Sequence, residues 1–295
     1  RSVFQQMLSS SNVWYADVET QRKLSMTSMD FQDIDYQVDE PVATITLNRP
    51  DQLNAFTRHT LSEIRQAINT AVSDQRVVGI VITGNGRAFS AGLDMSTLTE
   101  VTSAKGTGSR EAKSKQLPGI FSYFLEVPKP VIAAVNGVAA GGGLILAMMS
   151  DLRFASVDAS VTTVFLKRGL IAEHGSSWLL PRMVGVSKAL DLLWMSDKIS
   201  AEEAIEIGLI DRVCEPDQLL PEATAYIEKL AKTSAPKAIA ASKNLVYRHL
   251  GMAYPDALRE ADSVQGDFVG APDSIEGANA FIERRPPRFQ RLGDD

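Results

Sequence analysis

The chain contains little cysteine and little histidine. Its one cysteine is Cys214, and its three histidines are His59, His174 and His249. A single cysteine excludes intrachain disulfides and cysteine-based zinc sites, and it is typical of a reducing compartment such as the cytoplasm. The histidines lack metal-ligand spacing, so we expect no metal site. We expect Cys214 to fill the core and not to act as a nucleophile.

Excess positive charge and an export signal are also missing. The net charge is −6 and the pI is about 5.3. No basic stripe is present, which argues against nucleic acid as the partner. The N-terminal part lacks a basic region followed by an apolar run, so no secretory signal is expected.

No segment is a convincing membrane span. Residues 131–149 form an apolar run with Asn136 as its only polar residue, which approaches the roughly 20 residues that a span requires. The run also contains four glycines and a turn signal and has no flanking basic cluster. We therefore assign it to the protein core.

With 295 residues and 44% hydrophobic content, the chain can bury a full core. Strands alternate with helices in the first part and helices follow alone, which indicates an α/β core with a helical C-terminal region. We expect residues 29–215 to form the core and residues 216–295 the helical region. Because the chain begins with arginine, our hypothesis is that Met26 or Met29 is the natural start and that residues 1–28 are an extension, disordered or added for expression.

Hydrophobic periodicity predicts the individual elements. Strands are expected at 42–47, 77–83, 131–135, 152–156, 160–166 and 209–215. Helices are expected at 58–73, 174–183, 186–196, 201–207, 217–232, 235–249, 253–268 and 272–284. We expect the polar stretch 100–116 to form a loop beside a site and, with residues 121–124, to shape a ligand pocket.

Residues 131–149 also carry the first chemical signal. The strand 131–135 is followed by a turn at Asn136-Gly137, and Gly141 to Gly143 open an apolar helix that runs to Met149. Glycine allows close approach of a ligand, and the first amides of a helix have no partner within it. These N–H groups can hold a developing negative charge, although glycines that serve only core packing would look the same.

The segment AFSAGLDM, residues 88–95, supplies a second donor. Its small residues let a ligand lie along the backbone, and the N–H of Leu93 could face the same point as that of Gly142. Two convergent backbone donors form an oxyanion hole, and loss of one such donor costs roughly 3–4 kcal/mol. We expect Asp94 to be a turn or cap residue, not a catalyst.

These motifs resemble the crotonase, or enoyl-CoA hydratase/isomerase, superfamily. The resemblance covers about residues 38–292 and is carried by TLNRPDQLNAF, GRAFSAGLDM, KPVIAAVNGVAAGGG and EGANAFIERRPPRF. It implies a spiral of ββα units, a homotrimer or a dimer of trimers, and acyl-CoA substrates without any other cofactor. It assigns the oxyanion donors to Leu93 and Gly142. The implied CoA contacts are Ala55, Phe56, Ala91, Gly92, Leu93, Asp94, Gly142, Phe281 and Arg284.

The chain departs from the hydratase pattern of this superfamily. Hydratases use two glutamates, and the matching positions here are Ile145 and Phe165. Adding water to a double bond requires a group that polarises water and a proton source, and two apolar side chains supply neither.

A different carboxylate stands at Glu173, in KRGLIAEHGSSWLLPRMVG, residues 167–185. This segment resembles that of Δ3,Δ2-enoyl-CoA isomerases, in which an acid at the matching position moves the proton. Leu170, Ile171, Ala172 and Trp178 suggest an apolar setting that would make the carboxylate a better base. We expect His174 to be a polar wall residue, and Asp151 a structural hydrogen bonder.

The sequence therefore favours an enoyl-CoA isomerase with Glu173 as the acid/base. A hydratase or CoA-thioester hydrolase that uses other groups remains an alternative. A family member retained for acyl-CoA binding without catalysis is a third hypothesis.

Overall fold

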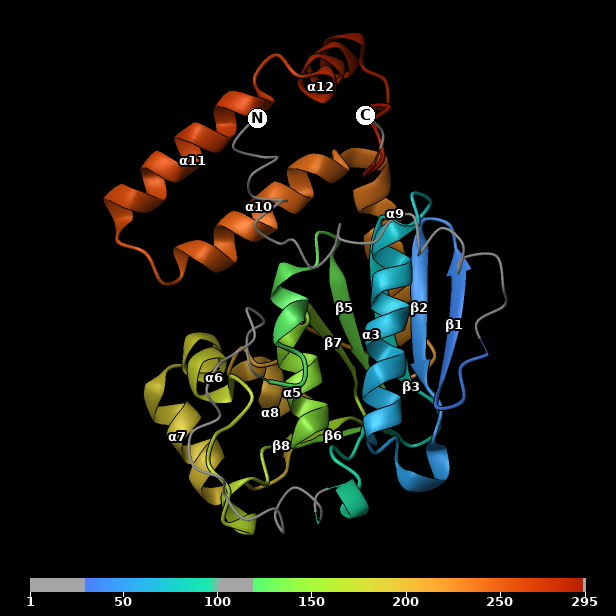
Figure 1. The fold of residues 1–295 in the computed structure, drawn as a ribbon, viewed down its shortest axis with the longest axis vertical. Helices are drawn as coiled ribbons and strands as arrows, with labels where there is room; N and C mark the ends of the chain where they lie inside the picture. The colour runs from blue at the N-terminus through green and yellow to red at the C-terminus, as the bar shows by residue number, and fades with distance from the viewer. Residues whose placement is uncertain (1–29, 98, 100–118, 294–295) are drawn as a thin grey trace.

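The computed structural model describes residues 30–97, 99 and 119–293. The expectations for residues 1–28 and 100–116 lie outside this part of the chain. The described chain folds as an α/β structure with two sheets and a series of C-terminal helices (Figure 1). This is the fold class that the sequence predicts.

The larger sheet has six strands in the order β1 (Ile34–Asp39), β2 (Val42–Leu47), β3 (Gly79–Gly84), β5 (Val131–Val135), β7 (Leu152–Ser156) and β10 (Arg212–Cys214). β1 and β2 pair antiparallel, and the other neighbours pair parallel. Every residue of β5 is buried, as expected for a parallel strand covered on both faces. This explains why its sequence is apolar without alternation.

The smaller sheet contains β4 (Ala88–Ser90), β6 (Val138–Ala140), β8 (Ser160–Thr162) and β9 (Ile199–Ser200). β4, β6 and β8 each follow a strand of the larger sheet after a short turn. The Asn136 side chain joins two of these turns, accepting from the Gly84 N–H at 3.0 Å and donating to the Gly86 carbonyl at 2.9 Å. The strand expected at 160–166 ends at Thr162 because the chain then turns toward the site.

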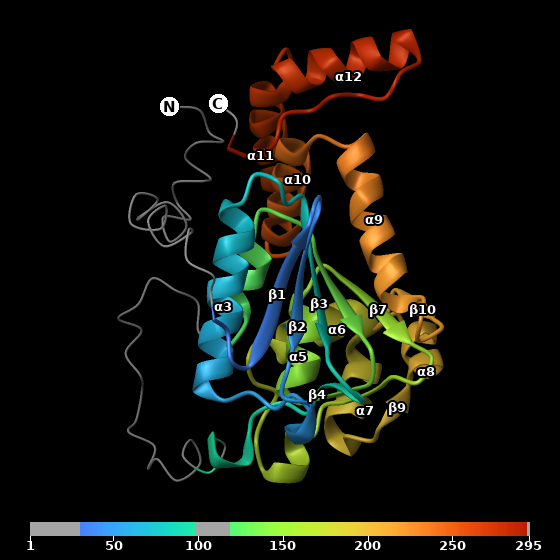
Figure 2. The same cartoon turned by 90° about the vertical axis from the view of Figure 1, so that its right-hand side faces the viewer.

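Helices cover both faces of the larger sheet. α3 (Arg58–Ser73) and α5 (Gly142–Met149) lie on one face and α9 (Leu219–Thr233) on the other (Figure 2). All eight residues of α5 are buried, which agrees with a helix that is apolar all round. α9 packs Leu219, Ala223 and Ile227 against the sheet.

The remaining helices are α6 (Ser176–Val184), α7 (Val186–Met195), α8 (Ala201–Glu206), α10 (Pro236–His249), α11 (Tyr254–Phe268) and α12 (Pro272–Glu283). In Figure 1, α10 to α12 lie at one end of the larger sheet, and β6 and β8 lie at the other. Within the described ranges, no helix combines the length and the apolar character needed to cross a bilayer.

Asp151 connects α10 to the larger sheet. Its carboxylate accepts from the Val131 N–H at 2.7 Å, from Nζ of Lys243 at 2.7 Å and from the Tyr247 hydroxyl at 3.0 Å. The prediction that Asp151 is a structural hydrogen bonder is confirmed. It fastens α10 to β5.

Candidate active site

One cavity lies at the N-terminal end of α5, on the side away from α10 to α12. It encloses about 330 Å³ of empty space, part of it open to solvent. Nine residues from three separate segments line it, namely Leu93, Gly141, Gly142, Val164, Phe165, Arg168, Leu170, Glu173 and His174. The three residues to which the sequence assigns catalytic roles, Leu93, Gly142 and Glu173, are all among them.

The backbone around Leu93 leaves its N–H free. Leu93 pairs with Phe56 in a parallel bridge, in which Phe56 donates to the Gly92 carbonyl at 2.7 Å and accepts from the Asp94 N–H at 3.0 Å. Groups of successive residues in an extended segment alternate in direction, so the Leu93 N–H points away from Phe56. No acceptor for it is found in the part of the chain that the structure describes.

Gly142 is the first residue of α5, and Gly141 is its N-cap. The first N–H groups of a helix lack intrahelical acceptors, and among the described residues the Gly142 N–H finds no other acceptor. The wall is assembled closely here, since a Cβ on Gly92 would lie 2.9 Å from the Gly142 nitrogen. Two unpartnered backbone donors therefore border one cavity.

Position 143 requires glycine because the neighbouring backbone leaves no space for a Cβ. A Cβ at this position would lie 2.2 Å from the Ser90 carbonyl oxygen. By contrast, a Cβ on Gly142 would meet its nearest neighbours at 3.4 and 3.5 Å, which is ordinary contact. The packing hypothesis therefore accounts for Gly143 but leaves Gly142 available for a ligand.

Glu173 lies three residues before the first residue of α6. Its backbone carbonyl accepts from the N–H of Ser176 at 3.1 Å and from the Ser176 hydroxyl at 2.8 Å, which fixes the segment that carries the side chain. The side chain is 32% exposed, and Oε1 lies 3.4 Å from Nε2 of His174. The carboxylate thus borders the cavity while keeping access to solvent.

The apolar setting expected for Glu173 exists only on one side. Leu170 lines the cavity, but Ile171 is 77% exposed and cannot shield the carboxylate within this chain. Trp178 stacks under the guanidinium of Arg182 at 4.1 Å. The expectation was wrong for Ile171 because the segment 169–172 is a loop, in which neighbouring side chains point in different directions.

The two positions that carry glutamates in hydratases are apolar and buried. Ile145 lies inside α5 with no exposed surface. Phe165 is 4% exposed and borders the cavity. Neither side chain can activate a water molecule.

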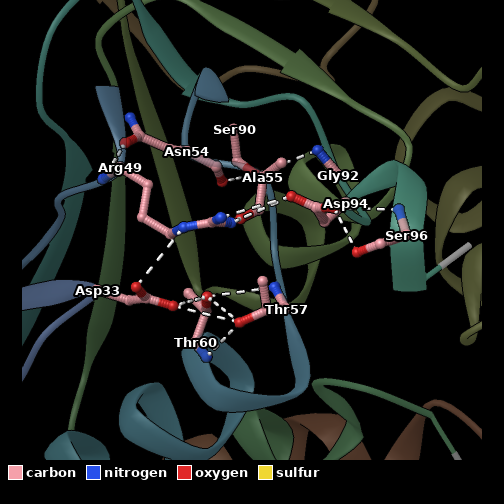
Figure 3. A network of polar contacts seen from close by, with 10 residues as sticks. All are labelled: Asp33, Arg49, Asn54, Ala55, Thr57, Thr60, Ser90, Gly92, Asp94 and Ser96. Atoms are coloured by element: carbon pink, nitrogen blue, oxygen red, sulfur yellow. Dashed lines mark hydrogen bonds and ion pairs between the residues drawn. The ribbon is translucent and has the colours of Figure 1, made fainter. Parts of the chain in front are cut away.

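The loop that carries Ala55 and Phe56 is fastened to the Gly92–Asp94 segment by Arg49. The guanidinium donates to the Ala55 carbonyl and lies 3.4 Å from Asp94 and 3.6 Å from Asp33 (Figure 3). Hydrogen bonds from the Ser96 side chain and N–H, together with Arg49, lower the pKa of Asp94. Asp94 is therefore a charged turn residue, in agreement with its predicted structural role.

The predicted CoA contacts near the cavity would be made mostly by backbone groups. Phe56 is fully buried and packs edge-on against Phe121 at 5.3 Å, and the Ala91 N–H is occupied by the Leu53 carbonyl at 2.9 Å. Phe121 and Phe124 belong to the core and do not line the cavity. The expectation that residues 121–124 shape the pocket was therefore wrong for these two side chains.

Phe281 and Arg284 are not brought to the cavity. They lie in and directly after α12, at the opposite end of the molecule (Figure 1). Phe281 is 86% exposed. Their assignment as CoA contacts therefore stays a prediction, and within one chain they are far from Leu93 and Gly142.

Arg168 was not predicted, although it borders the cavity. It ends the 3-10 helix η3 (Leu166–Arg168), five residues before Glu173. The pair Lys167-Arg168 next to the candidate acid is a signal that could have drawn attention to it.

Other candidate chemistries find little support. Burial raises the pKa of the Cys214 thiol, which reduces its reactivity, and the residue is half-buried in β10, not fully in the core. In the described ranges, no three histidine, cysteine or acidic residues gather as metal ligands.

The chain is similar to known proteins of one family. Residues 37–292 match the family described as "Enoyl-CoA hydratase/isomerase". The chain is 33% identical over 258 residues to a short-chain-enoyl-CoA hydratase from Clostridium acetobutylicum, covering 87% of this chain and 97% of that protein. It is 31% identical over 261 residues to a trans-2-decenoyl-[acyl-carrier-protein] isomerase from Streptococcus mutans, covering 88% and 99%.

Solved structures of similar proteins share the fold of this chain. A crystal structure of an enoyl-CoA hydratase/isomerase from Mycobacterium paratuberculosis superposes with a TM-score of 0.80 at 32% identity, covering 88% of this chain and 99% of that chain. Hydratase names predominate among the similar proteins. The fold is thus that of the crotonase superfamily.

Proposed function

This chain belongs to the enoyl-CoA hydratase/isomerase family, and on that premise we propose that it moves the double bond of an enoyl-CoA thioester, with Glu173 as the acid/base. One observation carries the proposal. Among the described residues that line the cavity, Glu173 is the only carboxylate, and it shares that cavity with the free amides of Leu93 and Gly142. The positions of the hydratase glutamates hold Ile145 and Phe165.

A single carboxylate is sufficient for this reaction. The thioester oxygen accepts hydrogen bonds from the N–H groups of Leu93 and Gly142. Glu173 removes a proton from C2 of a 3-enoyl thioester, and the electron pair of that C–H bond forms the C1–C2 double bond of a dienolate whose oxygen is held by the two amides. Glu173 then returns the proton to C4, the thioester carbonyl is restored and the double bond comes to lie between C2 and C3. No water is consumed, and the carboxylate is regenerated.

The cavity lies against the two amides and Glu173, so it suits the reacting end of a thioester. The nucleotide would therefore lie outside, along the Ala55–Phe56 and Ala91–Asp94 segments. Leu170, Val164 and Phe165 provide apolar walls for the acyl chain and limit access of water to the dienolate.

Hydration is the second candidate. The hydratase names of most relatives favour it, and His174 beside Glu173 offers a second polar group at 3.4 Å. Thioester hydrolysis and binding without catalysis are further alternatives. Isomerisation, hydration and hydrolysis give different products, and binding without catalysis gives none.

The test compares the wild type with Glu173→Gln on a panel of 3-enoyl-CoA thioesters, with formation of the conjugated 2-enoyl product followed directly. We expect Glu173→Gln to lose about 10²- to 10⁴-fold in kcat. Glu228→Gln, on an exposed face of α9, is the matched control and should retain full activity. The same enzymes are assayed for water addition to crotonyl-CoA and for release of free CoA thiol. Faster hydration than isomerisation, or equal rates for wild type and Glu173→Gln, would refute the proposal.

A further inference from the structure

Arg168 is an exposed residue at the border of a cavity whose other walls are largely apolar. It is the only lysine or arginine among the described residues that line the cavity. The polar side chains beside it in that wall are Glu173 and His174, and the remaining contributors are apolar or glycine. A guanidinium in such a wall favours a ligand that carries a negative charge.

The position of Arg168 is fixed by its backbone. The N–H groups of Arg168 and Leu170 both donate to the Phe165 carbonyl at 3.0 Å, and the Gly169 N–H donates to the Leu166 carbonyl at 3.0 Å. Gly169 adopts a left-handed conformation (φ 70°), which closes this turn. The backbone of Arg168 therefore belongs to a hydrogen-bonded turn, three residues after the buried Phe165.

The guanidinium has no protein partner in the described part of the chain. No ion pair links it to Glu173 within 4.0 Å, although both residues border the same cavity. Its neighbour Lys167 is engaged elsewhere, donating to the Ser196 carbonyl at 3.0 Å and to Asp197 at 3.2 Å. Lys167 and Arg168 are adjacent in one turn, and of these two residues Arg168 alone borders the cavity.

We propose that Arg168 determines specificity by binding a carboxylate at the far end of the acyl chain, so that the preferred substrate is the CoA thioester of a dicarboxylic acid. The location favours the acyl group over the CoA phosphates. Arg168 shares its cavity with Glu173 and the two amides, whereas Ala55, Phe56 and Asp94 of the predicted CoA path do not line it. Arg168 would also offset the repulsion between such a carboxylate and Glu173.

This inference rests on the proposed function only in taking the ligand to be an acyl thioester. Its first test is therefore equilibrium binding, which needs no turnover. Glutaryl-CoA and valeryl-CoA are saturated thioesters of equal chain length that differ in the terminal carboxylate. We expect the wild type to prefer glutaryl-CoA, and Arg168→Met to weaken glutaryl-CoA binding by about tenfold, the effect of one charge-assisted pair. Valeryl-CoA binding should change less than about twofold.

Two variants serve as controls. Lys167→Met removes one positive charge from the adjacent residue and should leave both affinities unchanged. Arg168→Lys keeps the charge and should recover part of the preference for glutaryl-CoA. Thermal unfolding of each variant verifies that the fold is intact.

The contribution of the CoA nucleotide to binding is tested with N-acetylcysteamine thioesters of the same two acids. These thioesters lack the phosphates of CoA. The preference for the glutaryl group, and its loss in Arg168→Met, should persist with them. Weaker binding of both CoA thioesters together, with no effect on either N-acetylcysteamine thioester, would show that Arg168 contacts the phosphates and would overturn the inference. Unchanged binding of all four ligands would overturn it as well.

Turnover separates this inference from the proposed function. With 3-hexenedioyl-CoA and 3-hexenoyl-CoA as substrates, Arg168→Met should lower kcat/KM for the first by about tenfold and leave the second unchanged. If the wild type isomerises neither compound but still prefers glutaryl-CoA in binding, the proposed function fails while the role of Arg168 stands.

Discussion

Nε2 of His174 lies 3.4 Å from Oε1 of Glu173, although these residues are neighbours in the chain. The backbone of His174 is left-handed (φ 54°), which is uncommon for a residue other than glycine. This conformation turns the imidazole and the carboxylate toward the same cavity. His174 is therefore placed to orient the Glu173 carboxylate beside the cavity.

The first prediction concerns this pair. His174→Asn should keep the fold, because asparagine tolerates the left-handed region, but should lower kcat by roughly tenfold through a less well oriented Glu173. KM for a 3-enoyl-CoA should stay nearly constant. Steady-state kinetics measure both values, and a higher KM with an unchanged kcat would instead indicate that His174 contributes only to binding.

The second prediction isolates the Gly142 N–H. Proline is favourable at the first position of a helix and lacks an N–H, so Gly142→Pro should retain α5 while losing about 10²- to 10³-fold in kcat. Gly142→Ala keeps the N–H, and its Cβ would make only ordinary contacts at 3.4 Å or more.

Circular dichroism and kinetics of both variants provide the measurement. The alanine variant should stay close to wild type in structure and in rate. If the proline variant is folded and fully active, the Gly142 amide is not an oxyanion donor.

The third prediction concerns the pair Asp151–Lys243. The Lys243 side chain is 9% exposed and the Asp151 side chain 18% exposed, and Nζ lies 2.7 Å from the carboxylate. Burial lowers the pKa of Lys243, while Asp151 opposes that effect. Asp151→Asn would leave a buried ammonium without its counter-charge, so we expect a loss of about 3 kcal/mol or more in the free energy of unfolding.

Urea denaturation provides the measurement. Asp191→Asn is the control, because Asp191 is 56% exposed in its pair with Lys188, and it should cost less than about 1 kcal/mol. Equal losses in the two variants would mean that the buried pair contributes no more than an exposed one.

The fourth prediction is a pH dependence caused by Lys129. This residue is 1% exposed and donates to the Ala71 and Asp74 carbonyls at 2.8 and 2.7 Å. Burial lowers its pKa from 10.5 to about 7. The unfolded chain keeps this proton up to about pH 10.5, whereas the folded chain releases it above about pH 7.

Between these values the unfolded state binds more protons, so the free energy of unfolding contributed by Lys129 rises with pH. The slope is at most about 1.4 kcal/mol per pH unit. Unfolding free energies of the wild type and Lys129→Met, measured at about pH 6.5 and about pH 9, should show the wild type gaining on the variant at the higher pH. Parallel curves for the two proteins would refute the assigned shift.

The sequence predicted the larger elements because their periodicity extends over several turns or residues. The helix at 58–73 was predicted with the bounds that α3 has, and the strands at 131–135 and 152–156 match β5 and β7. β1 was not predicted, and neither were β4, β6 and β9, whose two or three residues carry no detectable alternation. Their pairing is long-range, since β4 contacts β6 about fifty residues later.

The site was predicted less completely than the fold. Leu93, Gly142 and Glu173 could be identified from motifs, and the structure brings them to one cavity. Arg168 could not, because the pattern does not tell which of two adjacent cations pairs with Asp197 and which borders the cavity. The exposure of Ile171 was equally unpredictable, since it depends on how a loop turns.

The complete burial of Ile145 restricts how a second carboxylate could be added beside the cavity. A glutamate introduced there would be an unpaired charge inside an apolar helix, at a cost of several kcal/mol, a large share of the roughly 5–15 kcal/mol that keeps a typical protein folded. A glutamate at position 165 would instead border the cavity. An evolutionary path to a two-carboxylate site would therefore pass through position 165 first, and through position 145 only after surrounding residues had changed.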